Sequence, residues 1–300
     1  MKLRTSGTTR YSIVWRNWVH KPITAIFGLA LARKIKLIRD DHTADGKPTV
    51  FAVTHVFYDD LAAVSCSLKR SAYILNGIEG PNNTPTLAEY IALWLNGVIL
   101  VNRSDKQSRA ESLGFMVEVL NQGGDVFICP ESAWNFSPNA MIRKLNWGAL
   151  IAAEQTGANV VPVAVDIVDD CYCVIIGKNF DYAEYSDLRE ATEGLRGEMA
   201  TLAWELICMK QHVLRENISD SYWLDHIKAQ YARMPLKDQY KEETYMYRPK
   251  DEVSLGELLA EMHGIEHKSM AVDYEAYRKV EQLIDNWTKP VRLPYGEHKG

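Results

Sequence analysis

Residues 98–130 read VILVNRSDKQSRAESLGFMVEVLNQGGDVFICP, and their pattern indicates the fold class. A short apolar run, 98–102, is followed by a segment with helical spacing that ends at paired glycines, 107–124. A second apolar run, 125–130, comes next. Apolar runs of this length, bounded by turn residues, are typical of buried strands. The stretch therefore predicts a strand, a helix and a second strand, the unit from which parallel sheets are built.

The same alternation continues on both sides of this unit. Strands are predicted at 49–54, 71–76, 98–102, 125–130, 159–168 and 171–177. Helices are predicted between them at 59–69, 84–97, 107–124 and 146–157. Strands that alternate with helices predict an α/β fold, in which a largely parallel central sheet is flanked by helices.

Two further segments lie outside this alternation and complete the predicted domain organisation. From residue 188 onward, apolar residues recur every three or four positions, which predicts an amphipathic helix. Residues 216–300, rich in Tyr and Trp, are predicted to form a helical extension. The predicted organisation is a basic N-terminal helical segment over 1–40, an α/β domain over 41–215 and the extension over 216–300.

The N-terminal segment has an unusual charge. Residues 1–39 contain basic side chains and no Asp or Glu, although the whole chain carries a net charge of −5. Trp15, Trp18 and Phe27 are interleaved with the basic residues. This composition suits the surface of an anionic membrane. The alternative is a helix pair packed on the domain, with solvated Lys and Arg at its rim. Nucleic acid is not expected as a partner, because the rest of the chain is acidic and carries no recognition motif.

The cysteines and the apolar runs indicate the compartment. Five cysteines are scattered without a disulfide framework or a C-x-x-C pattern, which favours a reducing cytoplasm. The longest apolar run near the N-terminus, residues 22–32, is well short of the roughly 18 residues that a membrane span needs. We therefore expect a cytoplasmic protein without a transmembrane segment, peripheral at the inner face of the membrane.

Polar side chains follow the predicted strands directly. His55, Arg103 and Glu131 each come after a strand, at the positions where α/β sheets bind ligands. Asp59 and Asp60 open the next helix, with Asp59 expected as its N-cap. A histidine beside a carboxylate is the base and orienting pair of a catalytic triad. Because the chain has no G-x-S-x-G elbow, the nucleophile would be a substrate hydroxyl. The simpler alternative is a loop histidine followed by ordinary helix-start carboxylates.

The order of these elements between residues 54 and 166 resembles the glycerolipid acyltransferase family, which includes the 1-acylglycerol-3-phosphate acyltransferases. The family's H-x-x-x-x-D motif stands here as His55 to Asp60, and its strand with a closing Arg stands as GVILVNR, ending at Arg103. An F-P-E-G-T-R-like element stands as CPESAWN, with Glu131. A glycine-and-helix element, NWGALIAAEQTG, and a V-P-V strand, VVPVAV, complete the order.

The resemblance implies an activity and roles for these residues. It implies acyl transfer from a thioester, acyl-CoA or acyl-carrier protein, to a hydroxyl of a glycerol-phosphate or lysophospholipid acceptor. His55 and Asp60 would be the catalytic dyad, and Arg103 and Glu131 would help to bind the acceptor, commonly through its phosphate. A thioester is already activated, so a base, alignment and oxyanion stabilisation suffice. Neither a metal nor a cofactor is expected.

Two positions depart from the family pattern. Ser132 stands where the family has Gly, and Trp134 stands where it has Arg. The missing cation would come from Arg143 or Lys144, or the acceptor would differ from the usual one. Ser132, Asn135 and Arg143 are accordingly predicted to bind substrate. Trp134 and Asn135 offer a stacking surface and different hydrogen bonds.

Two other functions remain as alternatives. The first is a non-catalytic lipid-binding protein that retains the acyltransferase fold, and the presence of the dyad and both acceptor residues argues against it. The second is a metallohydrolase, because HGIEH at 263–267 matches the H-x-x-E-H pattern of a zinc site. Gly264 lies inside the helix that such a motif needs, so a polar helix end is favoured.

Overall fold

The computed structural model describes residues 3–57, 59–78, 87–135, 140–211, 214–219 and 221–222. Residues up to 211 belong to one compact unit. Residues 214–222 belong to a second unit, to which the short 3-10 helix η2 (Arg215–Asn217) contributes. Most of the predicted extension over 216–300, including the HGIEH motif, lies outside the described residues.

One seven-stranded sheet organises the first unit. Its strands are β1 (Lys34–Asp40), β2 (Thr49–Val53), β3 (Ala72–Gly77), β4 (Val98–Val101), β5 (Asp125–Ile128), β6 (Asn159–Val168) and β7 (Cys171–Ile176). They lie in the order β1-β7-β6-β2-β5-β3-β4. All neighbours pair in parallel except β6 and β7, which are antiparallel. The predicted α/β fold with a largely parallel sheet is confirmed.

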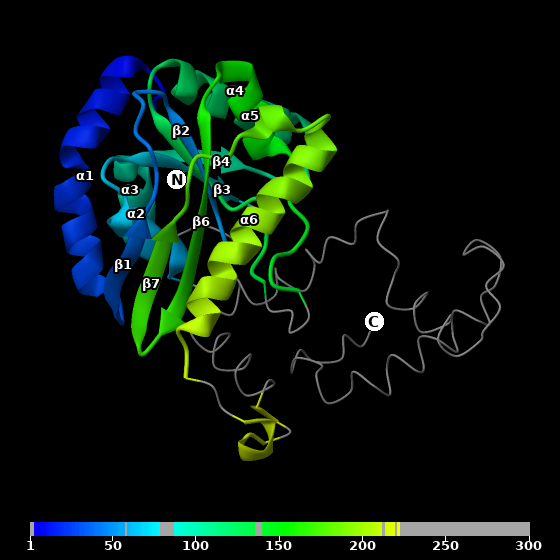
Figure 1. Ribbon diagram of the computed structural model, residues 1–300. Coiled ribbons are helices and arrows are strands. Elements are labelled where there is room, and N and C mark those ends of the chain that lie inside the picture. Colours follow the sequence, from blue (N-terminus) through cyan, green and yellow to red (C-terminus); the bar gives the residue numbers. More distant parts are fainter. Residues whose placement is uncertain are drawn as a thin grey trace, which may run out of the picture. The chain divides into compact units, whose positions relative to one another are not determined.

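Helices cover both faces of this sheet (Figure 1). They are α1 (Arg10–Ala30), α2 (Asp60–Ser67), α3 (Leu87–Asn96), α4 (Lys106–Asn121), α5 (Gly148–Thr156) and α6 (Leu188–Cys208), with a 3-10 helix η1 (Tyr182–Glu184) before α6. α1, α2 and α3 lie on one side, where α1 packs against the other two. α4, α5 and α6 lie on the other side. Each predicted helix of the α/β domain is present within a few residues of its expected bounds.

The central strand β2 shows why apolar runs marked the strands. All five of its residues are buried. Phe51 and Val53 join the core cluster under α2, whereas Val50 and Ala52 join the cluster under α4, α5 and α6. A parallel strand covered on both faces needs apolar side chains at every position, so its sequence shows no alternation.

The N-terminal segment differs from its prediction. Residues 34–40, which we expected within a helical segment, form β1 and pair in parallel with β7. Lys34 and Lys36 are exposed, whereas Ile35 packs on the core cluster under α2. Charged side chains on an edge strand discourage pairing with other chains. The segment is therefore one helix and one edge strand rather than a pair of helices.

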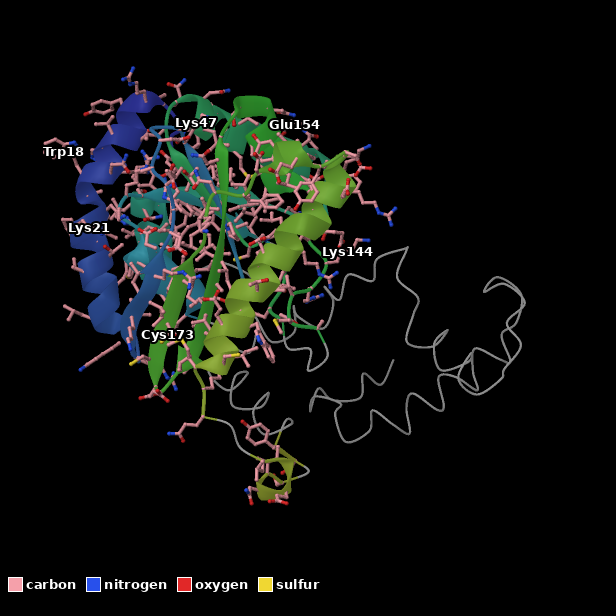
Figure 2. The ribbon with its side chains drawn as sticks, in the orientation of Figure 1. Trp18, Lys21, Lys47, Lys144, Glu154 and Cys173 are labelled. Atoms are coloured by element: carbon pink, nitrogen blue, oxygen red, sulfur yellow. The ribbon has the colours of Figure 1, made fainter. Side chains whose placement is uncertain are left out.

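Helix α1 buries polar side chains and exposes apolar ones. Arg16, His20 and Thr24 are at most 7% exposed, whereas Trp18 and Leu29 are 79% and 89% exposed. Figure 2 shows Trp18 pointing away from the body of the domain. No helix among the described residues combines the length and the apolar character that crossing a membrane would need.

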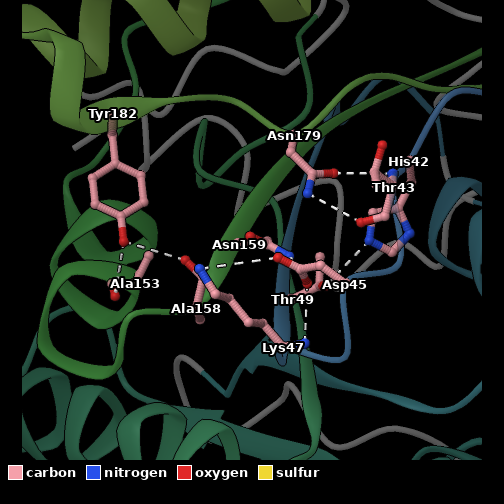
Figure 3. Close-up of polar contacts among 10 residues, drawn as sticks. All are labelled: His42, Thr43, Asp45, Lys47, Thr49, Ala153, Ala158, Asn159, Asn179 and Tyr182. Atoms are coloured by element: carbon pink, nitrogen blue, oxygen red, sulfur yellow. Dashed lines mark hydrogen bonds and ion pairs between the residues drawn. The ribbon is translucent and has the colours of Figure 1, made fainter.

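The loops at the amino-terminal edge of the central strands are tied to one another (Figure 3). The side chain of Asn179 accepts from the Thr43 backbone N–H (3.2 Å) and donates to the Thr43 carbonyl (3.1 Å). The Asn159 amide donates to Asp45 Oδ1 at 2.8 Å. These contacts close that edge, and the polar residues singled out from the sequence lie at the opposite, carboxyl edge.

Candidate active site

The H-x-x-x-x-D motif forms a hydrogen-bonded pair at the end of β2. His55 Nδ1 lies 2.8 Å from Asp60 Oδ2, and the Asp60 side chain is fully buried. The same oxygen accepts the backbone N–H groups of Val56 (2.8 Å) and Phe57 (3.2 Å). The loop thus wraps around one carboxylate oxygen, which requires the four intervening residues. Because Nδ1–H donates to Asp60, Nε2 is the basic nitrogen of the ring.

Asp59 does not act as the cap that we expected. It occupies the N-cap position of α2, but its side chain makes no capping hydrogen bond. Instead, the Tyr172 hydroxyl donates to Asp59 Oδ2. The Tyr172 ring also stacks on Phe57, with centroids 5.2 Å apart. The fully buried Tyr172 on β7 therefore holds the loop between His55 and Asp60, called the dyad loop below. No local motif in the sequence predicted this role.

Glu131 joins two loops of the site. It is 3% exposed, and its two oxygens accept the backbone N–H groups of His55 (3.1 Å) and Arg143 (2.8 Å). Burial raises the pKa of this carboxyl group to about 7, and the two backbone donors partly offset that rise. Glu131 thus joins the loop that carries His55 to the segment that carries Arg143, and we call this connection the clamp.

The residues after Glu131 continue this clamp. The Asn135 backbone N–H donates to the His55 carbonyl at 2.7 Å, and its side-chain amide donates to the carbonyls of Ala140 and Met141. Ser132 has a φ of 62°, in the left-handed region that favours glycine. This conformation explains why the family pattern has Gly here. Asn146 Nδ2 donates to the Ser132 hydroxyl at 2.7 Å.

Trp134 lies beside the dyad, where the family pattern has Arg. The centroids of its ring and the His55 ring are 5.1 Å apart, with the planes inclined by 37°. Its Nε1–H donates to the Phe57 carbonyl at 3.1 Å. Arg143 Nη1 donates to the Trp134 carbonyl at 3.2 Å, so this guanidinium is engaged with the loop.

Arg103 reaches the site from β4. Its guanidinium lies against Gly77 at the end of β3, where an added Cβ would stand 2.9 Å from Nη2. Gly77 therefore makes room for Arg103, and the sequence analysis missed this glycine. Since neighbouring strands are about 4.8 Å apart, the guanidinium over β3 is on the order of 10 Å from the end of β2 and His55.

The described residues hold no group of three His, Cys, Asp or Glu side chains that could bind a metal ion. At the end of β5, the Cys129 thiol lies close to Asp60 and Glu131. Desolvation, reinforced by these two carboxylates, raises the pKa of Cys129 well above its ordinary value. A thiol that stays protonated is a poor nucleophile, so Cys129 is not expected to act as one.

Known proteins resemble this chain in a sequence family and in the fold. Residues 34–166 match the family model described as Acyltransferase. Among solved structures, the chain is similar to the 1-acyl-sn-glycerophosphate (LPA) acyltransferase PlsC from Thermotoga maritima, with a TM-score of 0.51 and 16% sequence identity. The alignment covers 66% of this chain and 83% of that one. No curated protein matches the chain at a significant level.

Proposed function

We propose that the protein, whose residues 34–166 match the Acyltransferase family model, moves a fatty acyl group from acyl-CoA or acyl-carrier protein to a hydroxyl of a glycerol-phosphate or lysophospholipid acceptor. The observation that carries this proposal is the 2.8 Å hydrogen bond between His55 and the fully buried Asp60. A buried carboxylate that orients a histidine is the arrangement that general-base catalysis needs.

The reaction follows from this geometry. His55 Nε2 takes the proton of the acceptor hydroxyl as its oxygen attacks the thioester carbonyl. Asp60 holds the ring in the required tautomer and stabilises the imidazolium. When the tetrahedral intermediate collapses, the thiolate leaves and receives the proton back from His55. The new ester bond replaces the thioester bond, and the enzyme returns to its starting state without a covalent intermediate.

The dyad is tested by His55→Ala and Asp60→Asn, assayed with a labelled acyl thioester and a panel of acceptors. We expect His55→Ala to lower turnover by at least about a thousandfold, because the base is lost. Asp60→Asn should cost a similar factor, because the imidazole loses its orienting charge. Asp59→Asn is the matched control, since the amide oxygen still accepts from Tyr172. Near-normal turnover of His55→Ala, with an unchanged circular dichroism spectrum, would refute the mechanism.

Arg103 is proposed to bind the anionic group of the acceptor. A guanidinium pairs bidentately with phosphate or carboxylate, and its loss leaves the anion unpaired. Arg103→Ala should therefore raise the acceptor's KM at least tenfold and leave the donor's KM nearly unchanged. Lys106→Ala, which removes an exposed cation from the start of α4, is the control. Equal effects on both substrates would exclude this role for Arg103.

Glu131, Ser132, Asn135 and Arg143 are proposed to act on the acceptor through the clamp. Glu131 and Asn135 bind the backbone of His55, whereas Arg143 and Ser132 are held by Glu131 and Asn146. Together they would form the wall against which the acceptor lies. The acceptor is identified by offering glycerol 3-phosphate, lysophosphatidic acid and lysophospholipids with larger head groups, followed by mass spectrometry of the products. Trp134 stands where the family pattern has Arg, so one cation that could pair with a phosphate is missing. The panel should therefore include acceptors whose head group is larger than a bare phosphate.

We also propose that the outer face of α1 rests on the anionic inner face of the membrane. Large apolar side chains are exposed along this face: Tyr11, Val14, Trp18, Ile26 and Leu29. Exposed basic residues accompany them: Arg10, and Lys21, whose ammonium also donates to the Leu68 carbonyl at 2.9 Å. Residues 3–39 include no acidic side chain. An apolar face flanked by cations is complementary to an anionic interface. Arg16 also belongs to the basic residues of the N-terminal segment, but it is buried and cannot contribute to this contact.

Sedimentation with vesicles that contain an anionic phospholipid tests this orientation. Replacing Trp18 and Leu29 together by Ser should lower vesicle binding at least tenfold, because two large apolar side chains leave the interface. Trp204→Ser is the control, since Trp204 is 54% exposed on α6. Replacing Arg10 and Lys21 by Gln should weaken binding at low salt and have little effect at high salt. Unchanged binding of the Trp18 and Leu29 variant would exclude α1 as the contact.

A further inference from the structure

The indole of Trp134 covers one side of the imidazole that the proposed function makes the base. The ring centroids are 5.1 Å apart and the planes are inclined by 37°. The His55 side chain is only 16% exposed, so this contact lies in a largely desolvated place. A cation within about 6 Å of the centroid of a tryptophan ring is attracted to it, and desolvation strengthens the attraction.

Three contacts hold the indole in this position. Its own Nε1–H donates to the Phe57 carbonyl, inside the dyad loop, at 3.1 Å. Its carbonyl accepts from the Arg143 guanidinium at 3.2 Å. The next residue, Asn135, donates its backbone N–H to the His55 carbonyl at 2.7 Å. The indole is therefore bound to the backbone of Phe57, and the backbone of residues 134 and 135 is bound to Arg143 and His55, so the indole cannot turn away without breaking its bond to Phe57.

The two partners of His55 address different parts of its ring. Asp60 accepts from Nδ1 at the edge of the ring, and the Trp134 ring lies beside it with the two planes inclined by 37°. The Asp60 carboxylate stabilises the imidazolium through its charge. The π-system of Trp134 stabilises it further and does not occupy a ring nitrogen. An Arg at position 134, as in the family pattern, would place a positive charge beside the imidazolium and act in the opposite direction.

We propose that Trp134 is a positioning residue that holds His55 in the dyad loop and stabilises the imidazolium that forms when His55 takes the proton of the acceptor. This inference rests on the proposed function, in which His55 is the general base. It adds that the base is strengthened by an aromatic face supplied from the loop after β5.

Among the described residues, four charged or titratable groups lie on the elements packed around His55. Asp60 lies on α2, Glu131 and Cys129 lie on the β5 end, and Arg143 lies on the loop before α5. Replacing Trp134 leaves all of them in the chain. A change in the titration of His55 between Trp134 variants therefore reports on the indole, provided that the clamp stays formed.

The experiment measures the titration of the His55 imidazole directly by NMR, with its signal assigned by its loss in His55→Gln. Trp134→Leu removes the π-face, so we expect the pKa of His55 to fall by about half a unit or more. Trp134→Phe keeps a π-face and should leave the pKa close to that of the wild type. Trp134→Arg should lower it further than Leu, because a cation replaces the ring.

Turnover gives a second, independent readout. The acid limb of kcat/KM against pH should move to lower pH in Trp134→Leu by the same amount as the NMR titration, while the plateau falls severalfold. An unchanged or raised His55 pKa in a folded Trp134→Leu protein would overturn the proposal, even if turnover falls. The NMR result does not depend on activity, so it separates a failure of this inference from a failure of the proposed acyl transfer. If Trp134→Leu does not fold, the contrast between Trp134→Phe and Trp134→Arg decides the question in the same way.

Discussion

Helices α1 and α6 are both 21 residues long, and they differ in the side chains that they mainly bury. α6 places Leu195, Met199 and Leu206 in the core and presents its charged residues to solvent. α1 buries Arg16 and His20 and exposes large apolar residues. A stripe of similar residues every three or four positions thus shows that a helix has two faces. It does not show which face turns toward the protein.

The polar face of α1 is buried because the end of α3 offers it acceptors. Arg16 donates to the Trp94 carbonyl, in the last turn of α3, and also to the Tyr73 hydroxyl. The rings of Trp15, Trp94 and Tyr73 surround its guanidinium. Carbonyls at a helix C-terminus lack partners within their own helix and carry partial negative charge. A cation is therefore stabilised there without a carboxylate, which leaves the apolar side of α1 outward.

The helices should differ most in the loss of stability when an apolar residue of each is replaced by Asp. Leu195→Asp in α6 should lower the free energy of unfolding by more than about 4 kcal/mol, because it buries an unpaired carboxylate. Leu29→Asp in α1 should change it by less than about 0.5 kcal/mol, because Leu29 is 89% exposed. Urea unfolding of both variants measures the contrast. Similar losses from the two substitutions would show that the outer face of α1 is covered within the protein.

The next largest effect concerns the buried cation. Arg16→Leu should cost about 2 to 4 kcal/mol, because several carbonyl groups lose a charged donor while remaining buried. Arg10→Leu, at the exposed start of the same helix, should be nearly neutral. If Arg16→Leu raised the stability against urea, α1 would prefer an apolar inner face as α6 does. That result would contradict the difference between the two helices.

Replacing two glycines of α6 by Ala should change the stability by smaller amounts and in opposite directions. A Cβ at Gly194 would lie 2.4 Å from the Tyr185 ring, whereas a Cβ at Gly197 would meet nothing within 4 Å. Gly194→Ala should therefore destabilise by about 1 to 3 kcal/mol. Gly197→Ala should stabilise by about 0.5 to 1 kcal/mol. Thermal unfolding of the pair would show how closely the buried side of α6 is packed, and equal shifts in Tm would contradict this account.

The smallest effect is a dependence of the free energy of unfolding on pH, to which His20 of α1 contributes and α6 does not. Burial lowers the pKa of His20, and the contacts with the Leu68 carbonyl and Asn96 offset part of that shift. The unfolded chain then binds a proton at a higher pH than the folded one, so stability falls as the pH drops below about 6.5 and levels off below the folded pKa. α6 contains no histidine.

Replacing His20 by Gln should remove this loss, which is measured as the difference in urea stability between wild type and variant at pH 5 and pH 7.5. Glu131, whose pKa is raised to about 7, contributes in the opposite direction in both proteins and cancels in the difference. A difference that stays constant between the two pH values would mean that His20 is not buried as a neutral ring.

Much of the site was predictable because its parts are close in the chain or follow strands. His55 and Asp60 are five residues apart, so a short loop can bring them together whatever the rest of the chain does. Glu131 and Arg103 follow strands that were recognised from their apolar runs. What these residues touch was not predictable. Glu131 accepts from the His55 backbone across 76 residues, and Tyr172 donates to Asp59 across 113.

The sequence by itself determined the order of the strands and helices of the α/β domain, the largely parallel sheet and the pairing of His55 with Asp60. These features depend on local spacing: continuous apolar runs for strands buried on both faces, a period of 3.6 for helices, and a four-residue gap within the dyad. Only the tertiary structure decided that residues 34–40 pair with β7, that α1 turns its polar side inward, and that Trp134 lies beside His55. Each of these depends on which distant groups supply hydrogen-bond partners and cover, and the spacing of residues along the chain carries no record of those partners.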